Sequence, residues 1–230
     1  MIIKNDILKV KFVKRPNRFQ GYVIINGKEE LVHVPNTGRC KEILIPGCNV
    51  ILRKEDNPTR KTKYDLIAAY KEGKLINIDS HIPNKVVEEA LNLKKIDKLK
   101  EYNIIQREKT FGKSRFDFKL SKDTGEEYYL EVKGVTLEEK GHSKFPDAPT
   151  ERGTKHLLEL VDVINSGRGA GVLFLIQMDN IKTFTCNDDT DEKFGKALRY
   201  AKEKGVDIFA YQCKVCENSI ELYESVEIII

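Results

Sequence analysis

The chain has 230 residues, of which 40% are hydrophobic and 33% charged, and its formal net charge is +4. This balance is typical of a folded globular protein and excludes a disordered chain. No apolar run approaches the roughly 20 residues that span a bilayer. Charges interrupt the N-terminal stretch, which excludes a signal peptide and favours a cytoplasmic protein that does not enter a membrane.

The first eighty residues are predicted to form short strands separated by turns. Strand-like runs occupy residues 7–15, 21–26, 30–34, 42–47, 49–55, 65–73 and 74–79, and Asn26-Gly27 is a tight-hairpin signal. Several short strands without a strong helix favour a small OB-like β-barrel. Residues 1–80 contain 16 Lys and Arg against 9 Asp and Glu, a net +7, whereas the remainder carries −3. A basic first part suggests a phosphate-facing surface, with an ordinary lysine-rich surface as the alternative.

The composition changes near residue 82, where we place the boundary between a domain of residues 1–82 and one of residues 83–230. Pro83 and Asn84 are expected to open a helix. A second helix is predicted over 150–165, with Thr150 as N-cap and Gly167 just past its end. The apolar run 170–178 is typical of a strand buried on both faces. With a further helix at 191–205 and a strand at 206–215, the second domain is predicted to be α/β.

The five cysteines are expected to stay reduced in an intracellular chain. Cys213 and Cys216 form a CxxC, but no second pair or nearby histidine completes a zinc site. We therefore interpret them as two residues of a late strand.

A hairpin with arms 114–120 and 128–134 carries the candidate site. A turn centred on Thr124 pairs Phe118 with Leu130, and by extension Phe116 with Val132. The same register sets Asp117 opposite Glu131, so apolar and acidic positions match together.

Two carboxylates directly across a strand pair repel one another, so we expect a cation between them. One source of this positive charge is Lys133, which lies on the same face as Glu131, together with Arg115, which is expected opposite Lys133. A divalent ion, Mg²⁺ or Mn²⁺, held by Asp117 and Glu131 is the other, because Mg²⁺ is typically bound by one or two carboxylates. A lysine beside such an ion orients water or stabilises charge on a phosphate. These parts suit metal-assisted phosphodiester hydrolysis, with surface salt bridges as the competing explanation.

The helix after the hairpin has a polar face. Arg152, Lys155, His156 and Glu159 lie at helical spacing, and for Glu159 a solvated position is the simpler explanation. The Pro-rich turn before this helix is expected to bring Asp147 near the site.

Seven sequence blocks resemble one family over the whole chain. They are "RPNRF" (15–19), "HVPNTGR" (33–39), "RKTKYDL" (60–66), "GKSRFDF" (112–118), "LEVKGVTL" (130–137), "KFPDAPTERGTKHLLEL" (144–160) and "LFLIQ" (173–177). In this order they look like the sugar fermentation stimulation protein A (SfsA) family. The resemblance implies an N-terminal OB-like domain followed by a PD-(D/E)xK nuclease-like domain. It also implies a DNA-binding protein linked to sugar (maltose) metabolism.

The resemblance assigns roles residue by residue. Asp117 matches the metal-binding Asp of the nuclease-like motif, Glu131 its second acid and Lys133 its lysine. Glu89 looks like the acid that the first helix of such folds contributes, a better match than Glu88.

The basic residues of both domains are the candidate nucleic-acid contacts. Guanidinium groups beside an aromatic ring are how OB-type surfaces hold single strands. For "RPNRF" the alternative is a turn with a structural arginine. The predicted nucleic-acid-binding residues are Arg15, Arg18, Phe19, Arg39, Arg60, Lys61, Arg115, Arg152 and Lys155.

Three functions stay open at this point. The first is a DNA-binding protein with a Mg²⁺-dependent nuclease centre, and the second is a non-cleaving DNA-binding regulator of sugar metabolism genes. The third is a protein whose basic front meets an acidic partner other than nucleic acid. The sequence does not show whether the DNA is single- or double-stranded. It also does not show whether the protein forms a homodimer.

Overall fold

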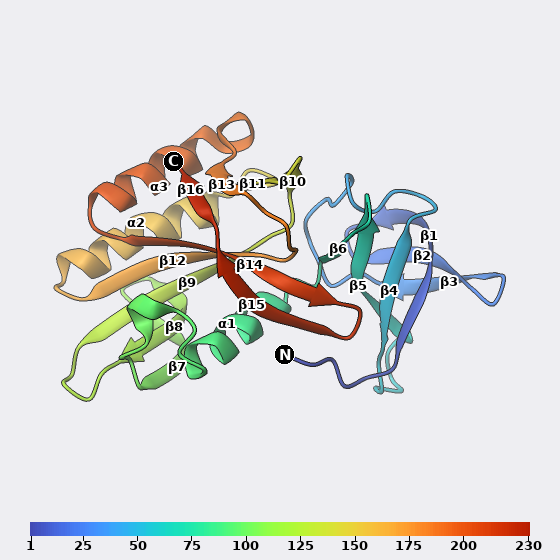
Figure 1. The fold of residues 1–230 in the computed structure, drawn as a ribbon, viewed down its shortest axis with the longest axis horizontal. Helices are drawn as coiled ribbons and strands as arrows, with labels where there is room; N and C mark the ends of the chain where they lie inside the picture. Colours follow the sequence, from blue (N-terminus) through green and yellow to red (C-terminus); the bar gives the residue numbers. More distant parts are fainter.

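The computed structural model describes residues 1–230, which form two lobes joined side by side (Figure 1). The first lobe is a six-stranded antiparallel sheet of order β3-β2-β1-β4-β5-β6 that closes partly into a barrel through one parallel pairing, His33 with Asp65. This is the predicted N-terminal OB domain. Its strands are β1 (Ile7–Asn17), β2 (Gln20–Ile25), β3 (Lys28–His33), β4 (Asn49–Lys54), β5 (Tyr64–Lys71) and β6 (Lys74–Asn77).

Local sequence explains most of the barrel's turns. Asn26 and Gly27 both have positive φ, at 50° and 78°, as a two-residue hairpin between β2 and β3 requires. Residues 42–47 were predicted as a strand, and this is wrong. The amides of Ile43 and Leu44 bond to the carbonyl of Cys40 in a turn, and both apolar side chains are buried in the core. The apolar residues of this segment therefore belong to a loop that packs into the core.

The second lobe is built around a mixed six-stranded sheet of order β15-β14-β12-β9-β8-β7. Helix α1 packs on one face, and α2 with α3 covers the other (Figure 1). A small sheet of order β10-β11-β13-β16 lies beside them. The elements are α1 (Ile82–Asn92), the 3₁₀ turn η1 (Asp97–Leu99), β7 (Ile104–Phe111), β8 (Ser114–Ser121), β9 (Glu127–Val135), β10 (Glu138–Glu139), β11 (His142–Phe145), α2 (Glu151–Asn165), β12 (Gly169–Ile176), β13 (Thr183–Cys186), α3 (Asp188–Glu203), β14 (Asp207–Cys216), β15 (Ser219–Ser225) and β16 (Glu227–Ile229).

The predicted helices and the buried strand are confirmed. Helix α1 begins with Pro83 in its first turn, and the Thr150 hydroxyl caps α2 by accepting from the Gly153 amide at 3.1 Å. Strand β12 is buried along nearly its whole length. Strands β7, β10, β11, β13, β15 and β16 were not foreseen, because they are short or polar residues interrupt their apolar patterns. Cys213 and Cys216 lie on β14, as predicted.

The two lobes share one hydrophobic core. A cluster of 35 buried residues runs from the barrel interior to the α2–α3 side of the second sheet, and a separate cluster of 17 lies under α1. Polar bridges add to this contact, among them Lys71 with Glu138 and Tyr70 with Glu217. The first residues of the chain also reach the second lobe, where Ile2 pairs with Ser219. The lobes are therefore packed as one body.

No helix of the structure combines the length and the apolar character needed to cross a membrane.

Candidate nuclease-like site

The hairpin of β8 and β9 has the predicted register as far as its ladder extends. Phe118 pairs with Leu130, and the three pairs toward the turn follow the same register. The ladder ends at Phe118, so the expected pairs Phe116–Val132 and Asp117–Glu131 do not form. The ring of Phe116 instead packs 5.9 Å from that of Tyr129, on the α2 side, whereas Val132 belongs to the core under α1.

A backbone irregularity accompanies this separation of the strands. On β7, Glu108 has a φ of 54° and lies between the residues that pair with Phe116 and Phe118. Such a conformation bends a strand locally. The Asp117 side chain occupies the opening between β8 and β9.

Asp117 is held by two donors. Its Oδ2 accepts from the Val132 amide at 2.8 Å, and its Oδ1 accepts from the Asn84 side-chain amide of α1 at 2.7 Å. Burial raises the pKa of Asp117, and the negative charge of Glu131 raises it further, against these two hydrogen bonds. The two carboxylates therefore act on one another, although they are not ladder partners.

Glu131 is 4% exposed, and only one of its two carboxylate oxygens has hydrogen-bond partners. His156 Nδ1 lies 2.5 Å and Lys133 Nζ 2.6 Å from Oε1, while the buried Oε2 has no partner. Burial alone would raise the pKa of Glu131, but the hydrogen bond from His156 and the charge of Lys133 outweigh burial, so the pKa is lowered. Glu131 is thus an ionised carboxylate with an open acceptor.

These two carboxylates fit a divalent cation. A buried carboxylate oxygen without a donor is costly unless something positive completes it. Hard cations such as Mg²⁺ take oxygen ligands and keep several waters. No group of three or more His, Cys, Asp or Glu side chains is arranged to hold a metal by itself. Asp117 and Glu131 would therefore hold an ion that takes its remaining ligands from water or substrate.

The structure does not bring Glu89 to this pair. Glu89 is 41% exposed and binds the amino group of Met1 at 2.5 Å. The α1 side chain that reaches Asp117 is Asn84, and Glu88 lies one helical turn from Asn84, near Arg107. The assignment of Glu89 as a catalytic acid is therefore not supported by its position. No pattern in the sequence singled out Asn84, because an amide in a first helical turn is ordinary capping chemistry.

His156 was also missed, since the sequence placed it on an exposed polar face. It is 5% exposed and bonds Glu131. Gly153, His156, Leu157 and Leu160 are all buried at i, i+3, i+4 and i+7 spacing, so His156 falls inside the buried stripe of α2. This spacing was the available signal.

Three predicted nucleic-acid contacts come together in a surface hollow beside His156. Arg115, Arg152 and Lys155 line it with Lys113, and we call this group the basic hollow. Arg115 pairs with Glu108 at 2.8 Å instead of facing Lys133 across the hairpin, as expected. Through His156, the basic hollow adjoins Glu131.

A second hollow lies on the barrel. Phe19, Arg60 and Lys61 line it, as do His33 and His81, and the Phe19 side chain is 54% exposed. Arg18 and Arg39 are exposed but line neither hollow. We call this group, Phe19, Arg60 and Lys61, the barrel hollow.

Arg15 has a structural role, which does not support its predicted assignment to nucleic acid. Its two terminal nitrogens donate to the carbonyls of Arg18, Asn36, Gly38 and Arg39 at 2.6–2.9 Å. Its Nε is buried without a partner. Arg15 thus organises the loop after β3 and presents no group to a phosphate.

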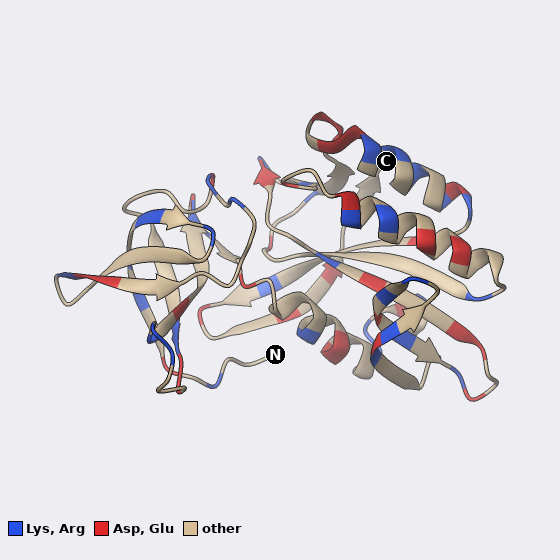
Figure 2. Cartoon of the chain, turned by 180° about the vertical axis from the view of Figure 1, so that it is seen from behind, with Lys and Arg blue, Asp and Glu red and all other residues tan.

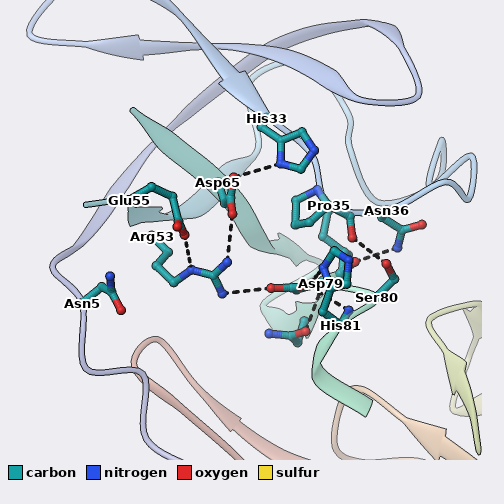
Figure 3. A network of polar contacts seen from close by, with 12 residues as sticks. Asn5, His33, Pro35, Asn36, Arg53, Glu55, Asp65, Asp79, Ser80 and His81 are labelled. Atoms are coloured by element: carbon teal, nitrogen blue, oxygen red, sulfur yellow. Dashed lines mark hydrogen bonds and ion pairs between the residues drawn. The ribbon is translucent and has the colours of Figure 1, made fainter. Parts of the chain in front are cut away.

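A half-buried ion network adjoins the barrel hollow (Figure 3). Arg53 on β4 donates to Glu55, Asp65 and Asp79 at 2.7–2.9 Å. Asp65 also lies 2.9 Å from His33 and bonds Arg60 at 2.5 Å. The network therefore fixes Arg60 and His33 and links the barrel to the segment that enters α1.

An OB barrel followed by a nuclease-like α/β domain, with Asp117 and the Glu131–Lys133 pair on adjacent strands, is the class of two-domain protein that the sequence blocks implied. Sequence comparison agrees with this class. The family described as "SfsA N-terminal OB domain" matches residues 13–78, and "Sugar fermentation stimulation protein RE domain" matches residues 81–219. The chain therefore belongs to the sugar fermentation stimulation protein family, as its sequence blocks indicated.

Curated relatives and a solved structure support this membership. A sugar fermentation stimulation protein homolog of Clostridium tetani is 68% identical over 230 residues, which cover all of both chains. One of Clostridium botulinum is 69% identical over 228 residues and 99% of each chain. The structure of Pyrococcus furiosus SfsA in complex with Ca²⁺ is similar with a TM-score of 0.90 at 29% identity, covering 100% of this chain and 98% of that one.

Proposed function

We propose that this protein is a metal-dependent nuclease that acts on DNA, with Mg²⁺ or Mn²⁺ as cofactor. The observation that carries the proposal is the pair of half-buried Asp117 and buried Glu131, in which one oxygen of Glu131 has no donor while Lys133 lies against the other. A pair of carboxylates held for folding alone would be expected to have every buried oxygen satisfied. The binding of Ca²⁺ by Pyrococcus furiosus SfsA supports the choice of a divalent ion.

Each residue of the site has a separable task. Asp117 and Glu131 would hold the cation, which when bound supplies positive charge to a phosphoryl oxygen. The Lys133 ammonium group offers a second positive charge at the same place and would stabilise the negative charge that develops on the phosphate. His156 and Asn84 are positioning residues, because each fixes one carboxylate by a hydrogen bond.

The two hollows would supply the contacts to DNA. The basic hollow is lined by cationic side chains that suit backbone phosphates, and it adjoins the carboxylates through His156. The barrel hollow adds an exposed ring on which a base can stack.

The test is cleavage of labelled single- and double-stranded DNA with Mg²⁺ or Mn²⁺, with a chelator control. We expect cutting that the chelator and Asp117→Ala both abolish. Lys133→Met should slow cutting by about 10²–10³-fold, the usual effect of losing one charge-stabilising donor. Lys122→Met, at the exposed turn of the same hairpin, is the matched control and should cut normally.

The contrary outcome is equally specific. DNA binding that is unchanged by Asp117→Ala, with no cutting under any metal, would reject the nuclease. It would favour the alternative, a DNA-binding regulator that keeps the carboxylates for folding.

A further inference from the structure

A cavity of about 210 Å³ lies between the two lobes, next to the carboxylate pair. The barrel contributes the loop of Asn36, Thr37 and Gly38, and the second lobe contributes Asn84 and Val132. Asn84 and Val132 are the two residues that donate hydrogen bonds to Asp117. The cavity thus shares a wall with the proposed metal site.

The lining is polar but nearly uncharged. Only 3 of its 14 residues are hydrophobic, and its only charged members are Lys144 and Asp147. Amides and hydroxyls supply most of the rest. Such a surface does not suit a phosphate, which takes arginine, lysine or several backbone amides. It suits a neutral group with both donors and acceptors. The amide and hydroxyl residues are Asn36, Thr37, Ser80, Asn84, Thr136 and Gln177.

Gln177 offers a hydrogen-bond acceptor in the wall of this cavity. It is 2% exposed, and its Nε2 donates to the Asn77 backbone and side-chain oxygens and to the Asp79 carbonyl at 2.9–3.3 Å. These contacts fix which end of the amide is the nitrogen. Its Oε1 has no hydrogen-bond partner and lies against Gly134, which also lines the cavity. An amide oxygen left open at a cavity wall can accept a hydrogen bond from a ligand that enters the cavity.

The cavity also has apolar surfaces that suit a flat ring. Phe145 and Pro83 line it together with Val132. Its volume is below the range of about 300–1,000 Å³ that drug-sized ligands occupy. One nucleobase combines these features, since it has a flat apolar face and an edge of donors and acceptors that Asn and Gln read.

We propose that this interlobe cavity binds one unpaired nucleobase of the DNA strand whose phosphate lies at Asp117. The inference rests on the proposed function in that it takes DNA as the ligand. A base can enter only after it leaves the duplex stack, which is least costly in single strands and at unpaired positions. The cavity would therefore make the protein select unpaired nucleotides.

The test uses 2-aminopurine, a fluorescent adenine analogue, as the single unpaired base in a duplex and as a paired base in a matched duplex. Binding is measured in chelator, so that no cleavage is needed, by 2-aminopurine fluorescence and by the anisotropy of a separate end label. Thr37 is exposed on the barrel loop, so Thr37→Trp fills the cavity from its rim. The matched control is Thr124→Trp at the exposed turn between β8 and β9, a position that does not line the cavity.

We expect the wild-type chain to bind the unpaired duplex more tightly and to change its 2-aminopurine signal. Thr37→Trp should lose that signal and about tenfold in affinity, the usual weight of one base stacked on protein, and Thr124→Trp should lose neither. Equal affinity for both duplexes, or an unchanged signal in Thr37→Trp, would overturn the inference while the anisotropy still reports binding. Absence of any anisotropy change with either duplex would overturn the proposed function and the inference together.

Discussion

Glu131 is buried and Asp117 is half-buried, and their surroundings move their pKa values in opposite directions. Burial and the charge of Glu131 raise the pKa of Asp117. The pKa of Glu131 is lowered, because His156 and Lys133 outweigh its burial. Two neighbouring carboxylates whose pKa values are moved apart are common where protein side chains hold metals or protons for a reaction.

The raised pKa of Asp117 predicts a cost in stability. Because the folded pKa lies above the unfolded one, ionisation disfavours folding once the pH exceeds 3.8, the ordinary value. Asp117→Asn removes that cost, and Asn84 can turn its amide to accept a hydrogen bond. We therefore expect a higher Tm than wild type at pH 7 in chelator, with the difference shrinking toward pH 4, measured by thermal unfolding. Excess Mg²⁺ should raise the Tm of wild type but not of Asp117→Asn. A variant less stable than wild type at pH 7 would contradict this account.

Arg15 and Arg18 lie in one sequence block but have different tasks. Removing Arg15 leaves carbonyl oxygens of the loop without donors, at about 1–3 kcal/mol for each buried group. We expect Arg15→Met to lower the free energy of unfolding by about 2–4 kcal/mol in urea titration. Arg18→Met changes an exposed side chain and should stay within about 0.5 kcal/mol. Similar losses in the two variants would show that Arg15 is not the structural member of the pair.

At the scale of elements, the hairpin shows what the sequence can and cannot predict. Period-two alternation predicted the register of β8 and β9, because a slip of one residue would move Phe118 and Leu130 to the other face of the sheet. The end of the ladder at Phe118 depends on the neighbouring β7, where Glu108 adopts a left-handed backbone. Asn84 and His156 come from helices on opposite faces of the sheet. Such convergence depends on tertiary packing, so a single sequence gives the acids but not the residues that hold them.

The pairing of β4 with β5 depends on a buried aspartate. Burial alone would raise the pKa of Asp65, but hydrogen bonds from Arg60 and His33 lower it to about 2. Its contribution to stability is therefore present above pH 3.8 and is lost as the pH falls through about 2. We expect the stability difference between wild type and Asp65→Asn, measured by urea unfolding, to shrink from pH 4 to pH 2. A difference that stays constant over this range would show that Asp65 is not ion-paired.

At the scale of the whole molecule, charge is mixed. Lys and Arg alternate with Asp and Glu over both lobes (Figure 2). Arg53 and Arg60, two of the basic residues of the first part, are held in ion pairs within the barrel. The number of basic residues in a sequence segment therefore overstates how many of them are free to meet DNA.

The basic hollow should dominate the salt dependence of DNA binding. Each phosphate contact contributes about 0.9 to the slope of log affinity against log salt on duplex DNA. We expect replacement of Arg115, Arg152 and Lys155 by Ala to flatten this slope by about one for each phosphate that is no longer neutralised, measured by anisotropy at several salt concentrations. A control that removes the same charge from exposed α3 and its C-terminal end, with Lys196, Lys202 and Lys204 changed to Ala, should leave the slope nearly unchanged. Equal flattening in both would mean that only total charge matters.

The core shared by the two lobes has a geometric consequence for the proposed nuclease. Close-packed interiors resist deformation, so the barrel cannot swing away from the sheet without opening that core. The span from the barrel hollow to Asp117 is therefore built into the fold. A DNA strand bound at the barrel hollow would then be cut at a constant number of nucleotides from the bound position, whatever its sequence.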